Sequence, residues 1–573
     1  MSSKVADARR SQLVSTYGVG SLFPAGDQSF MITGLDYWNQ WKAAEVPEPR
    51  LARSIGVRTF RMPPSGDDEG EDLPVIRFPR MHYCPQCGRL DRIDKFGAWN
   101  EHECKKCQRY LVPSRFVACC ANGHIEDFPY YRWVHARQGE PQGTHNLKLM
   151  TRGQSSSLAD IVISCSCGVP PRSLAGSFGP GALADVASCQ GRRPWLLGHH
   201  DASCVEKLRT LQRGSSNVWF AATRSAISIP PWSEGAFQVI DQVWQALRVI
   251  PAEVLEVTVN NMGLPQQAGV PAKELVQMIL AMRGETGDTA PSQQDLRDEE
   301  YDALVIGRTE SDPAQQFVCD TVDGLEDSAL AALDGVSRVA RLREVRALAG
   351  FTRVMPADGG DSKRVSPLSY GKLDWLPAVE VLGEGVFVRL SEDAVATWAG
   401  TSFARARAAA ITAAFEERAK LFGHPAPEPT TPRLLLLHSF AHILLTELSL
   451  DAGYPVASLR ERVYAREGQT GVLVYTATAD SAGSLGGLSA QSNPDRIWAV
   501  IQSAVRRARW CSSDPVCIES VGSGADALNL AACHACLLLP ETSCEHMNHV
   551  LDRASLVGRS GSPEEGFFHG LVS

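Results

Sequence analysis

The chain has 573 residues, several times the length of an ordinary domain, so we expect more than one compact unit. It is 44% hydrophobic and 21% charged, a balance that excludes a disordered or fibrous protein. The formal net charge is -9, from 56 basic and 65 acidic residues. Any binding to nucleic acid must therefore use a local basic surface.

The cysteines are the most informative residues. No apolar run approaches the roughly 20 residues that cross a bilayer. The first residues, MSSKVADARRSQLV, also lack the apolar core of a secretion signal, so we expect a cytoplasmic protein. In a reducing cytosol the 16 cysteines favour metal ligation over disulfides. They gather in two dense zones near the ends of the chain, with Cys319 alone between them.

Residues 1–80 are expected to form an N-terminal cap segment. Short apolar runs alternate with turn signals in TYGVGSLF and MITGLDYW, which favours a small sheet or cap over residues 1–60. The acidic stretch DDEGED at 67–72 is typical of a solvated loop.

Residues 81–232 are expected to form a zinc ribbon and a second cysteine-rich module. CPQC at 84–87 and CKKC at 104–107 are two Cys-x-x-Cys knuckles, sixteen residues apart. Each knuckle turns two sulfurs to one side, so the pair completes a closed tetrahedral site that suits Zn2+. Gly88 can supply the positive-φ step of the first turn. The predicted ligands are Cys84, Cys87, Cys104 and Cys107.

A looser group of cysteines follows the ribbon, from ACCANGHIEDFPYYRWVH to the cysteine at 204. It offers more than four candidate ligands, and spacing does not choose among them. The favoured zinc ligands are Cys120, Cys165, Cys167 and Cys189, with His124 and Cys204 in reserve. The alternative is that these are ordinary buried thiols.

Residues 233–432 are expected to be a mostly helical region with linkers. Helical apolar spacing is present at 235–250 and 273–282. Segments poor in large apolar residues or rich in proline predict loops or linkers. These segments are 283–300, 356–368 and 422–432.

Residues 433–573 form the best-patterned region. RLLLLHSFAHILLTELSL is apolar nearly all round and predicts a buried helix over 433–450. GVLVYTATAD at 471–480 predicts a central strand, followed by a glycine-rich turn. Asn493 is the predicted N-cap of the next helix, with Pro494 at its first position.

Basic residues accompany this last helix. Ile497, Ile501 and Val505 line one of its faces, while arginines gather at other angles. These arginines are typical either of a phosphate-binding stripe or of an ordinary solvated helix face. They are Arg496, Arg506, Arg507 and Arg509.

A second zinc site is predicted near the C-terminus. Cys517 is followed after fifteen residues by CHAC at 533–536 and then by ETSCEH. The predicted ligands are Cys517, Cys533, Cys536 and Cys544, and His534, His546 or Cys511 could substitute for one of them. Bound Zn2+ would contribute folding free energy to this short segment. With the middle cluster, we expect two to three zinc ions per chain.

No catalytic constellation is apparent, so we do not expect an enzyme. His438 and His442 have the spacing of a zinc-protease motif, but Ser439 stands where that chemistry needs a glutamate. Histidines in so apolar a helix are typical of satisfied core groups. Gly483, Gly486 and Gly487 are not followed by the Lys-Ser or Lys-Thr of a P-loop, and no Gly-x-Ser-x-Gly elbow is present.

The C-terminal region resembles a known family. The stretches LHSFAHILL, YTATADSAGSLGGL, DPVCIES and LNLAACHACLLLPETSCEHMNHVLDR are similar to the helicase-associated domain of unknown function. That family occurs at the C-terminus of certain superfamily 2 DNA helicases, including a mitomycin-repair helicase, where four cysteines hold zinc. The resemblance implies that role for Cys517, Cys533, Cys536 and Cys544.

Other stretches extend the resemblance over most of the chain. RSQLVSTYGVGSLF, CCANGHIEDFPYYRWVH, LQRGSSNVWFAATRSAISIP, LREVRALAGFTR and WLPAVEVLGEGVFV occur in that order. They resemble the stand-alone members of this family in the bacterial DISARM anti-phage system. There the stand-alone protein accompanies a DrmA-like superfamily 2 helicase, and the two together engage DNA.

The sequence thus predicts a multi-domain α+β protein with several structural zinc modules. The leading functional hypothesis is a non-motor accessory subunit that pairs with the helicase and helps bind or load DNA. One alternative is a zinc-stapled scaffold that never contacts DNA, and another is a metal-dependent nuclease or hydrolase. Arginines would track phosphates and an aromatic ring would stack on bases. The candidates for these contacts are Arg506, Arg507, Arg509, Arg192, Arg193 and Trp195.

Overall fold

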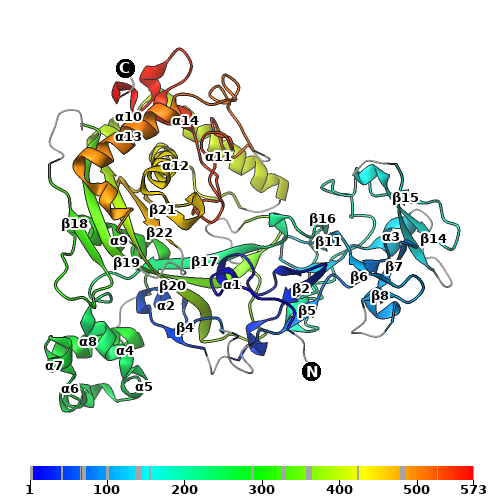
Figure 1. The fold of residues 1–573 in the computed structure, drawn as a ribbon, viewed down its shortest axis with the longest axis horizontal. Coiled ribbons are helices and arrows are strands. Elements are labelled where there is room, and N and C mark those ends of the chain that lie inside the picture. The colour runs from blue at the N-terminus through cyan, green and yellow to red at the C-terminus, as the bar shows by residue number, and fades with distance from the viewer. Residues whose placement is uncertain are drawn as a thin grey trace. The chain divides into compact units, whose positions relative to one another are not determined.

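The computed structural model describes most of the chain (Figure 1). The described residues are 4–39, 43–64, 66, 72–97, 102–136, 145–153, 157–285, 290–324, 331–356, 364–422, 425–477, 486–524 and 527–571. Most of the acidic stretch 67–72 and about half of the predicted break at 356–368 lie outside them. Helices and strands occur together in more than one compact unit, which confirms the multi-domain α+β class.

The chain divides into two units, each made from several segments. Unit 1 consists of Met1–Val46, Thr59–Arg224 and Arg346–Val379. Unit 2 consists of Pro47–Arg58, Ser225–Val345 and Glu380–Ser573. The domain boundaries drawn from the sequence stay predictions.

Unit 1 contains short strands in several small sheets. A six-stranded sheet has the order β10-β6-β7-β13-β14-β15, and two three-stranded sheets have the orders β1-β2-β5 and β12-β11-β16. The strands are β1 (Leu22–Ala25), β2 (Gln28–Ile32), β3 (Glu45–Val46), β4 (Thr59–Arg61), β5 (Val75–Arg77), β6 (Met81–Tyr83), β7 (Arg89–Arg92), β8 (Glu103–Cys104), β9 (Arg109–Tyr110), β10 (Val112–Pro113), β11 (Phe116–Cys119), β12 (Ile125–Asp127), β13 (Leu147–Thr151), β14 (Ile161–Cys165), β15 (Arg172–Ser173) and β16 (Arg209–Gln212). The helices are α1 (Gln12–Ser15) and α3 (Tyr130–His135).

A buried arginine ties the loops of unit 1 together. The guanidinium of Arg353 donates to the backbone carbonyls of Gly20, Gly123 and Val218, at 2.7, 2.9 and 2.6 Å. Burial lowers the pKa of Arg353 to about 10, so the side chain is still charged at neutral pH. Backbone carbonyls that would otherwise be buried without a donor are satisfied in this way.

Unit 2 is built on a larger sheet with the order β17-β19-β20-β22-β21, and β18 pairs with β19. Three of its strands, β17, β19 and β20, contribute residues to both units. The strands are β17 (Phe220–Ile227), β18 (Val318–Thr321), β19 (Leu333–Thr352), β20 (Trp375–Leu390), β21 (Leu459–Tyr464) and β22 (Gly471–Thr476). Every residue of β22 is buried between β20 and β21, which confirms the predicted central strand.

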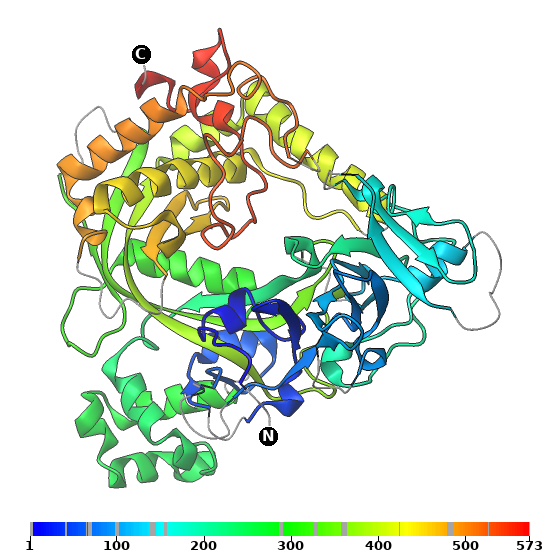
Figure 2. The same cartoon turned by 45° about the vertical axis from the view of Figure 1, so that its right-hand side comes forward.

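Both faces of β22 are covered by apolar side chains. Val472 and Val474 belong to a core cluster shared with the long helix α12 (Pro432–Ala452). Leu473 and Tyr475 belong to a second cluster, shared with α9 (Gln293–Ile306). Successive side chains of a strand point to opposite faces, so helices cover both sides of the sheet here. Figure 2 shows α12 and α13 over one side of the β21–β22 end.

The remaining helices of unit 2 cover the sheet or pack together on their own. The helices α4 to α8 share a separate small apolar core. The helices not yet bounded are α2 (Pro49–Ile55), α4 (Gly235–Gln242), α5 (Trp244–Leu247), α6 (Ala252–Asn261), α7 (Leu264–Ala268), α8 (Ala272–Arg283), α10 (Glu392–Ala399), α11 (Ser402–Phe422), α13 (Pro494–Ala508) and α14 (Arg553–Val557).

The predicted buried helix and the helix after Asn493 are both confirmed. The helix α12 is long and apolar enough to cross a membrane by composition, but 78% of its apolar window is buried inside the protein. The apolar composition of α12 is therefore explained by its place in the protein core. In α13, the Asn493 side chain accepts from the Asp495 backbone N–H, and Ile497, Ile501 and Val505 are buried.

Two predictions for the central region are wrong in part. The expected linker at 283–300 contains the start of α9, whose Ser292 and Asp295 form a reciprocal capping box. The region expected to be mostly helical also holds the two longest strands, β19 and β20. Charged residues such as Arg343 and Glu344 are buried in β19, and they obscured its apolar pattern.

A buried ion network joins the sheet of unit 2 to its flanking segments. Arg462 of β21 is fully buried and lies 2.7 Å from Glu300, 3.2 Å from Glu344 and 3.5 Å from Glu545. These carboxylates raise the pKa of Arg462 well above its usual value despite burial, which acts in the opposite direction. Removing the cation would leave several carboxylates buried beside one another.

We expect Arg462→Ala to lower the free energy of unfolding of unit 2 by about 3–5 kcal/mol, as for other broken buried ion pairs. The matched control is Arg466→Ala, which removes an exposed partner of Asp298 and should cost under about 1 kcal/mol. Urea denaturation of both variants measures the difference. Equal midpoints would show that the network contributes no more than a surface pair.

Candidate metal centres

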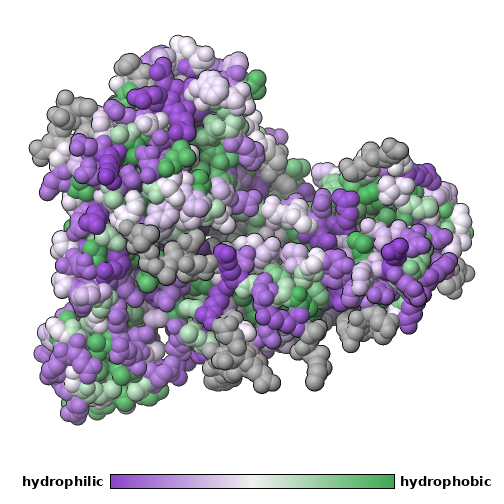
Figure 3. Space-filling view, in the orientation of Figure 1, coloured by the Kyte–Doolittle hydropathy of each residue, from purple (hydrophilic) through white to green (hydrophobic). Residues whose placement is uncertain are grey.

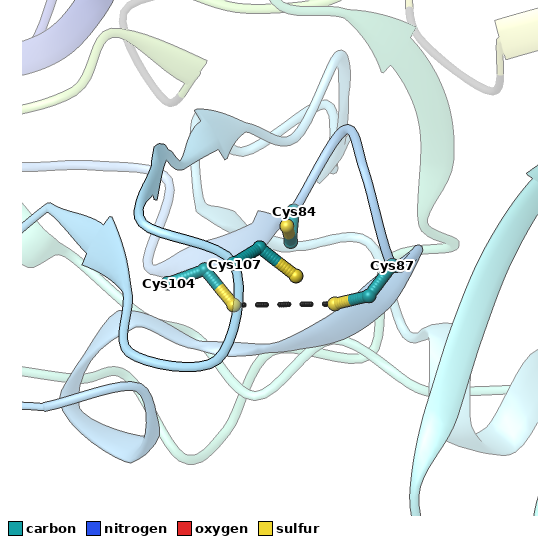
Figure 4. Close-up of side chains that lie close together, drawn as sticks. All are labelled: Cys84, Cys87, Cys104 and Cys107. Carbon is teal, nitrogen blue, oxygen red and sulfur yellow. Dashed lines mark hydrogen bonds between the residues drawn. The ribbon is translucent and has the colours of Figure 1, made fainter.

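The predicted zinc ribbon is assembled in unit 1 by two tight turns. Cys84 and Cys87 lie in the turn between β6 and β7, while Cys104 ends β8 and Cys107 lies in the turn that leads to β9. The four sulfurs lie within 4.8 Å of one another, and Figure 4 shows them pointing to a common centre. Gly88 has a φ of 71°, and a Cβ there would lie 2.7 Å from the Leu149 carbonyl oxygen. Both its conformation and its close approach require glycine.

The second cluster of unit 1 combines two favoured and two reserve ligands. Cys120, His124, Cys189 and Cys204 have their ligand atoms within 4.8 Å of one another. His124 Nδ1 lies 3.3 Å from Cys120 Sγ and 3.6 Å from Cys189 Sγ. The Gly191 N–H donates to Cys189 Sγ at 3.3 Å, as expected for a sulfur that carries negative charge.

The third cluster holds the other two favoured cysteines. Cys165 and Cys167 lie with His135, from α3, and His145. His135 Nε2 is 3.3 Å from Cys167 Sγ, and His145 Nδ1 is 3.3 Å from Cys165 Sγ. Cys167 is exposed, so solvent reaches this cluster.

The predicted single middle site is therefore corrected. The structure does not bring Cys120, Cys165, Cys167 and Cys189 together but divides them between two clusters. The physical reason is that Cys165 ends β14, next to the start of β13, which His145 precedes, and close to the end of α3, which carries His135. Cys120 and Cys189 lie beside His124 instead. Neither His135 nor His145 was considered from the sequence. Both lie well before the CSC motif in the sequence, and they approach it only through the pairing of β13 with β14 and the packing of α3 on β14.

Hydrogen bonds favour the thiolate form of one cysteine in each of these two clusters. The Cys120 side chain and His124 lower the pKa of the Cys189 thiol, although burial acts in the opposite direction. The Val169 N–H and the His135 ring lower the pKa of Cys167 to about 6. At neutral pH each cluster thus holds a sulfur that is ready to ligate a cation.

The C-terminal cysteine cluster of unit 2 contains Cys511, Cys517, Cys533 and Cys536. Cys511 Sγ is 3.5 Å from Cys533 Sγ, and Cys517 Sγ is 3.7 Å from Cys536 Sγ. The Ser513 N–H donates to Cys511 Sγ at 3.4 Å. All four groups are thiols, so the cluster fits a closed zinc site.

The predicted C-terminal ligand set is corrected at one position. Cys511, which was named as a substitute, completes the cluster in place of Cys544. Cys544 lies instead with His438, His442 and Glu461 in a fifth, fully buried cluster. The loop after Cys536 carries Cys544 toward α12 and away from the other three cysteines. The two histidines had been interpreted as satisfied core groups.

The candidate nucleic-acid contacts differ in exposure. Arg506, Arg507 and Arg509 are exposed at the end of α13, and Arg507 also pairs with Glu447 at 3.0 Å. Figure 3 shows largely hydrophilic surface over this helix. In unit 1, Arg192 is exposed and Arg193 is half-buried.

The prediction that Trp195 stacks on a base is wrong, because its side chain is fully buried. Its ring meets Phe351 edge-on at 5.0 Å, and its Nε1–H donates to the Pro367 carbonyl at 3.0 Å. A different tryptophan, Trp510, is 71% exposed and directly follows the arginines of α13. In the sequence, only its position between the arginines at the end of the helix and Cys511 indicated that it could contact nucleic acid.

Comparisons with known proteins agree with these modules. Residues 9–220 match a family described as a domain of unknown function, DUF8724, and residues 440–537 match the MrfA Zn-binding domain. The latter range contains Cys511, Cys517, Cys533 and Cys536 but not Cys544. The DISARM protein DrmB of Bacillus paralicheniformis is 29% identical, over 95% of this chain and 99% of that protein. The chain thus resembles the DISARM protein DrmB over almost its whole length, as its sequence motifs predicted.

Proposed function

We propose that this chain is a non-motor accessory subunit of bacterial anti-phage defence. It pairs with a superfamily 2 helicase in the cytoplasm and helps bind or load DNA. The observation that carries this proposal is the similarity to a DISARM protein over 95% of the chain. The sequence adds to it, because it lacks the Gly-x4-Gly-Lys-Ser/Thr pattern of an ATP-hydrolysing motor.

Structural zinc is the proposed cofactor of four clusters. The ligand sets are Cys84, Cys87, Cys104 and Cys107; Cys120, His124, Cys189 and Cys204; His135, His145, Cys165 and Cys167; and Cys511, Cys517, Cys533 and Cys536. Zn2+ prefers four cysteine or histidine ligands at tetrahedral positions, and each set supplies four. A set of four protein ligands leaves no position for a substrate, so these sites stabilise the fold.

The division of the middle cysteines predicts a specific zinc count. We expect the double variant Cys165→Ser/Cys189→Ser to lose two zinc ions per chain, because each change breaks a different cluster. Elemental analysis of the purified full chain measures this loss. The control is Cys319→Ser, since Cys319 is buried and belongs to none of the clusters. A loss of one ion in the double variant would favour a single shared middle site.

The proposed DNA contact is the segment where α13 ends. Arg506, Arg507, Arg509 and Trp510 are exposed there, and Cys511 follows them directly. Arg553 donates to the Ala508 carbonyl at 3.0 Å and fixes the last turn of the helix. Zinc on one side and a capped helix on the other would hold the cationic and aromatic side chains in place.

We expect Arg506→Ala/Arg507→Ala/Arg509→Ala to flatten the salt dependence of DNA binding by about one in the log–log slope for each lost phosphate contact. Trp510→Ala should instead weaken binding to single-stranded DNA by about 1–3 kcal/mol with little change in slope, because stacking releases no counterions. Titration of a labelled oligonucleotide over a range of salt concentrations distinguishes the two effects.

The control for charge is Arg248→Ala/Arg338→Ala/Arg405→Ala, which removes three exposed arginines from other elements of unit 2. Its slope should match that of the unaltered chain. If all variants bind DNA alike, with and without the helicase, the chain acts as a scaffold and the DNA-binding part of the proposal fails.

A further inference from the structure

We infer that the fifth cluster is a second structural zinc site of unit 2, formed by His438, His442, Glu461 and Cys544. The two histidines lie one turn apart on the same face of α12. Glu461 comes from β21, and Cys544 comes from the loop that precedes α14. Their ligand atoms all lie within 4.8 Å of one another. The inference does not depend on helicase pairing or on DNA binding.

Backbone carbonyls orient both imidazole rings toward the centre. His438 Nδ1 is 3.2 Å from the Val550 carbonyl oxygen, and His442 Nδ1 is 2.7 Å from that of Leu537. A carbonyl only accepts, so we assign the proton of each neutral ring to Nδ1. The lone pair of each Nε2 then points into the cluster, as in most zinc-binding histidines.

The groups that meet in the cluster are all electron-pair donors. His438 Nε2 lies 3.0 Å from Glu461 Oε1 and 3.2 Å from Cys544 Sγ, and His442 Nε2 lies 3.4 Å from Glu461 Oε1. Among the described residues, His442 Nε2 and Glu461 Oε2 are buried without a hydrogen-bond partner. A cation at the centre satisfies these atoms together.

One metal-free alternative is a core in which both rings are protonated. That arrangement would place two imidazolium rings with centroids 4.6 Å apart, against one carboxylate, in a region without solvent. Like charges so close in a buried site are strongly unfavourable. With Zn2+, the carboxylate of Glu461 and the thiolate of Cys544 instead balance the ion, and the net charge of the site is zero.

The ligand set favours zinc in a structural role. Two histidines and one carboxylate also form the facial triad of iron oxygenases, but such iron sites keep positions open to oxygen and substrate. Here Cys544 supplies a fourth ligand. All four side chains are at most 3% exposed. A closed tetrahedral set of nitrogen, oxygen and sulfur suits Zn2+.

The ion would fasten three parts of unit 2 that are distant in sequence. It joins the core helix α12, the edge strand β21 and the C-terminal loop. The Asn548 N–H donates to Cys544 Sγ at 3.3 Å, which supports a charged sulfur within that loop. Binding would release the thiol proton of Cys544, so its free energy becomes folding free energy of the C-terminal region.

Elemental analysis of the full chain tests the site. We expect five zinc ions per unaltered chain and four in Cys544→Ala, with no change in the Cys319→Ala control. Glu461→Gln, which keeps the shape of the side chain, should also lose one ion. An unchanged zinc count in a folded Cys544→Ala variant, or one equivalent of iron in place of that zinc, would overturn the inference.

A measurement on the unaltered chain covers the case in which these variants do not fold. After replacement of zinc by cadmium-113, the NMR signal of each ion reports its number of sulfur ligands. The fifth cluster alone has a single sulfur, so it should give one resonance upfield of all the others. Absence of that resonance while the four others are present would refute this site and leave the proposed function intact. Absence of the other four would instead count against the proposed function.

Discussion

A charge in the interior of this protein needs an opposite charge or hydrogen-bond partners beside it, because moving an isolated ion from water into a protein core costs several kcal/mol. Three solutions recur. Arg353 is satisfied by backbone carbonyls, and Arg462 by carboxylates of three other segments. The two all-cysteine clusters have no basic side chain among their ligand groups, and a bound cation would balance the charge of their thiolates.

The sequence predicted best where the chemistry is local. The four candidate ligands of the ribbon come from two short Cys-x-x-Cys segments, so their spacing alone predicted that their sulfurs meet. The ligands of the other clusters lie far apart in the chain, as with Cys120 and Cys204. Strand pairing and the paths of the loops decide which of these ligands meet, and the spacing of residues in the sequence does not predict either. Cys511 and Cys544 are both plausible partners of the CHAC motif, and only the path of the last loop separates them.

Buried polar residues also explain where the prediction of elements failed. The apolar helix α12 and strand β22 were found because hydrophobic burial alone specifies them. The strand β19 was missed because Arg343 and Glu344 are buried by pairing with distant partners. Similarly, α9 begins at a polar capping box and buries Glu300 against Arg462. Residues that look like solvated loop in the sequence are here part of the core.

The two candidate metal clusters of unit 2 include residues of one continuous segment. Cys536 and Cys544 belong to different clusters but are only eight positions apart, so the loop between them is held at both ends. Cys511 belongs to the same cluster as Cys536 and lies just after the end of α13, where Arg509 and Trp510 are exposed. Loss of metal at either centre would therefore loosen the base of the proposed DNA contact. Zinc would contribute to function through the position of these side chains, without touching the nucleic acid itself.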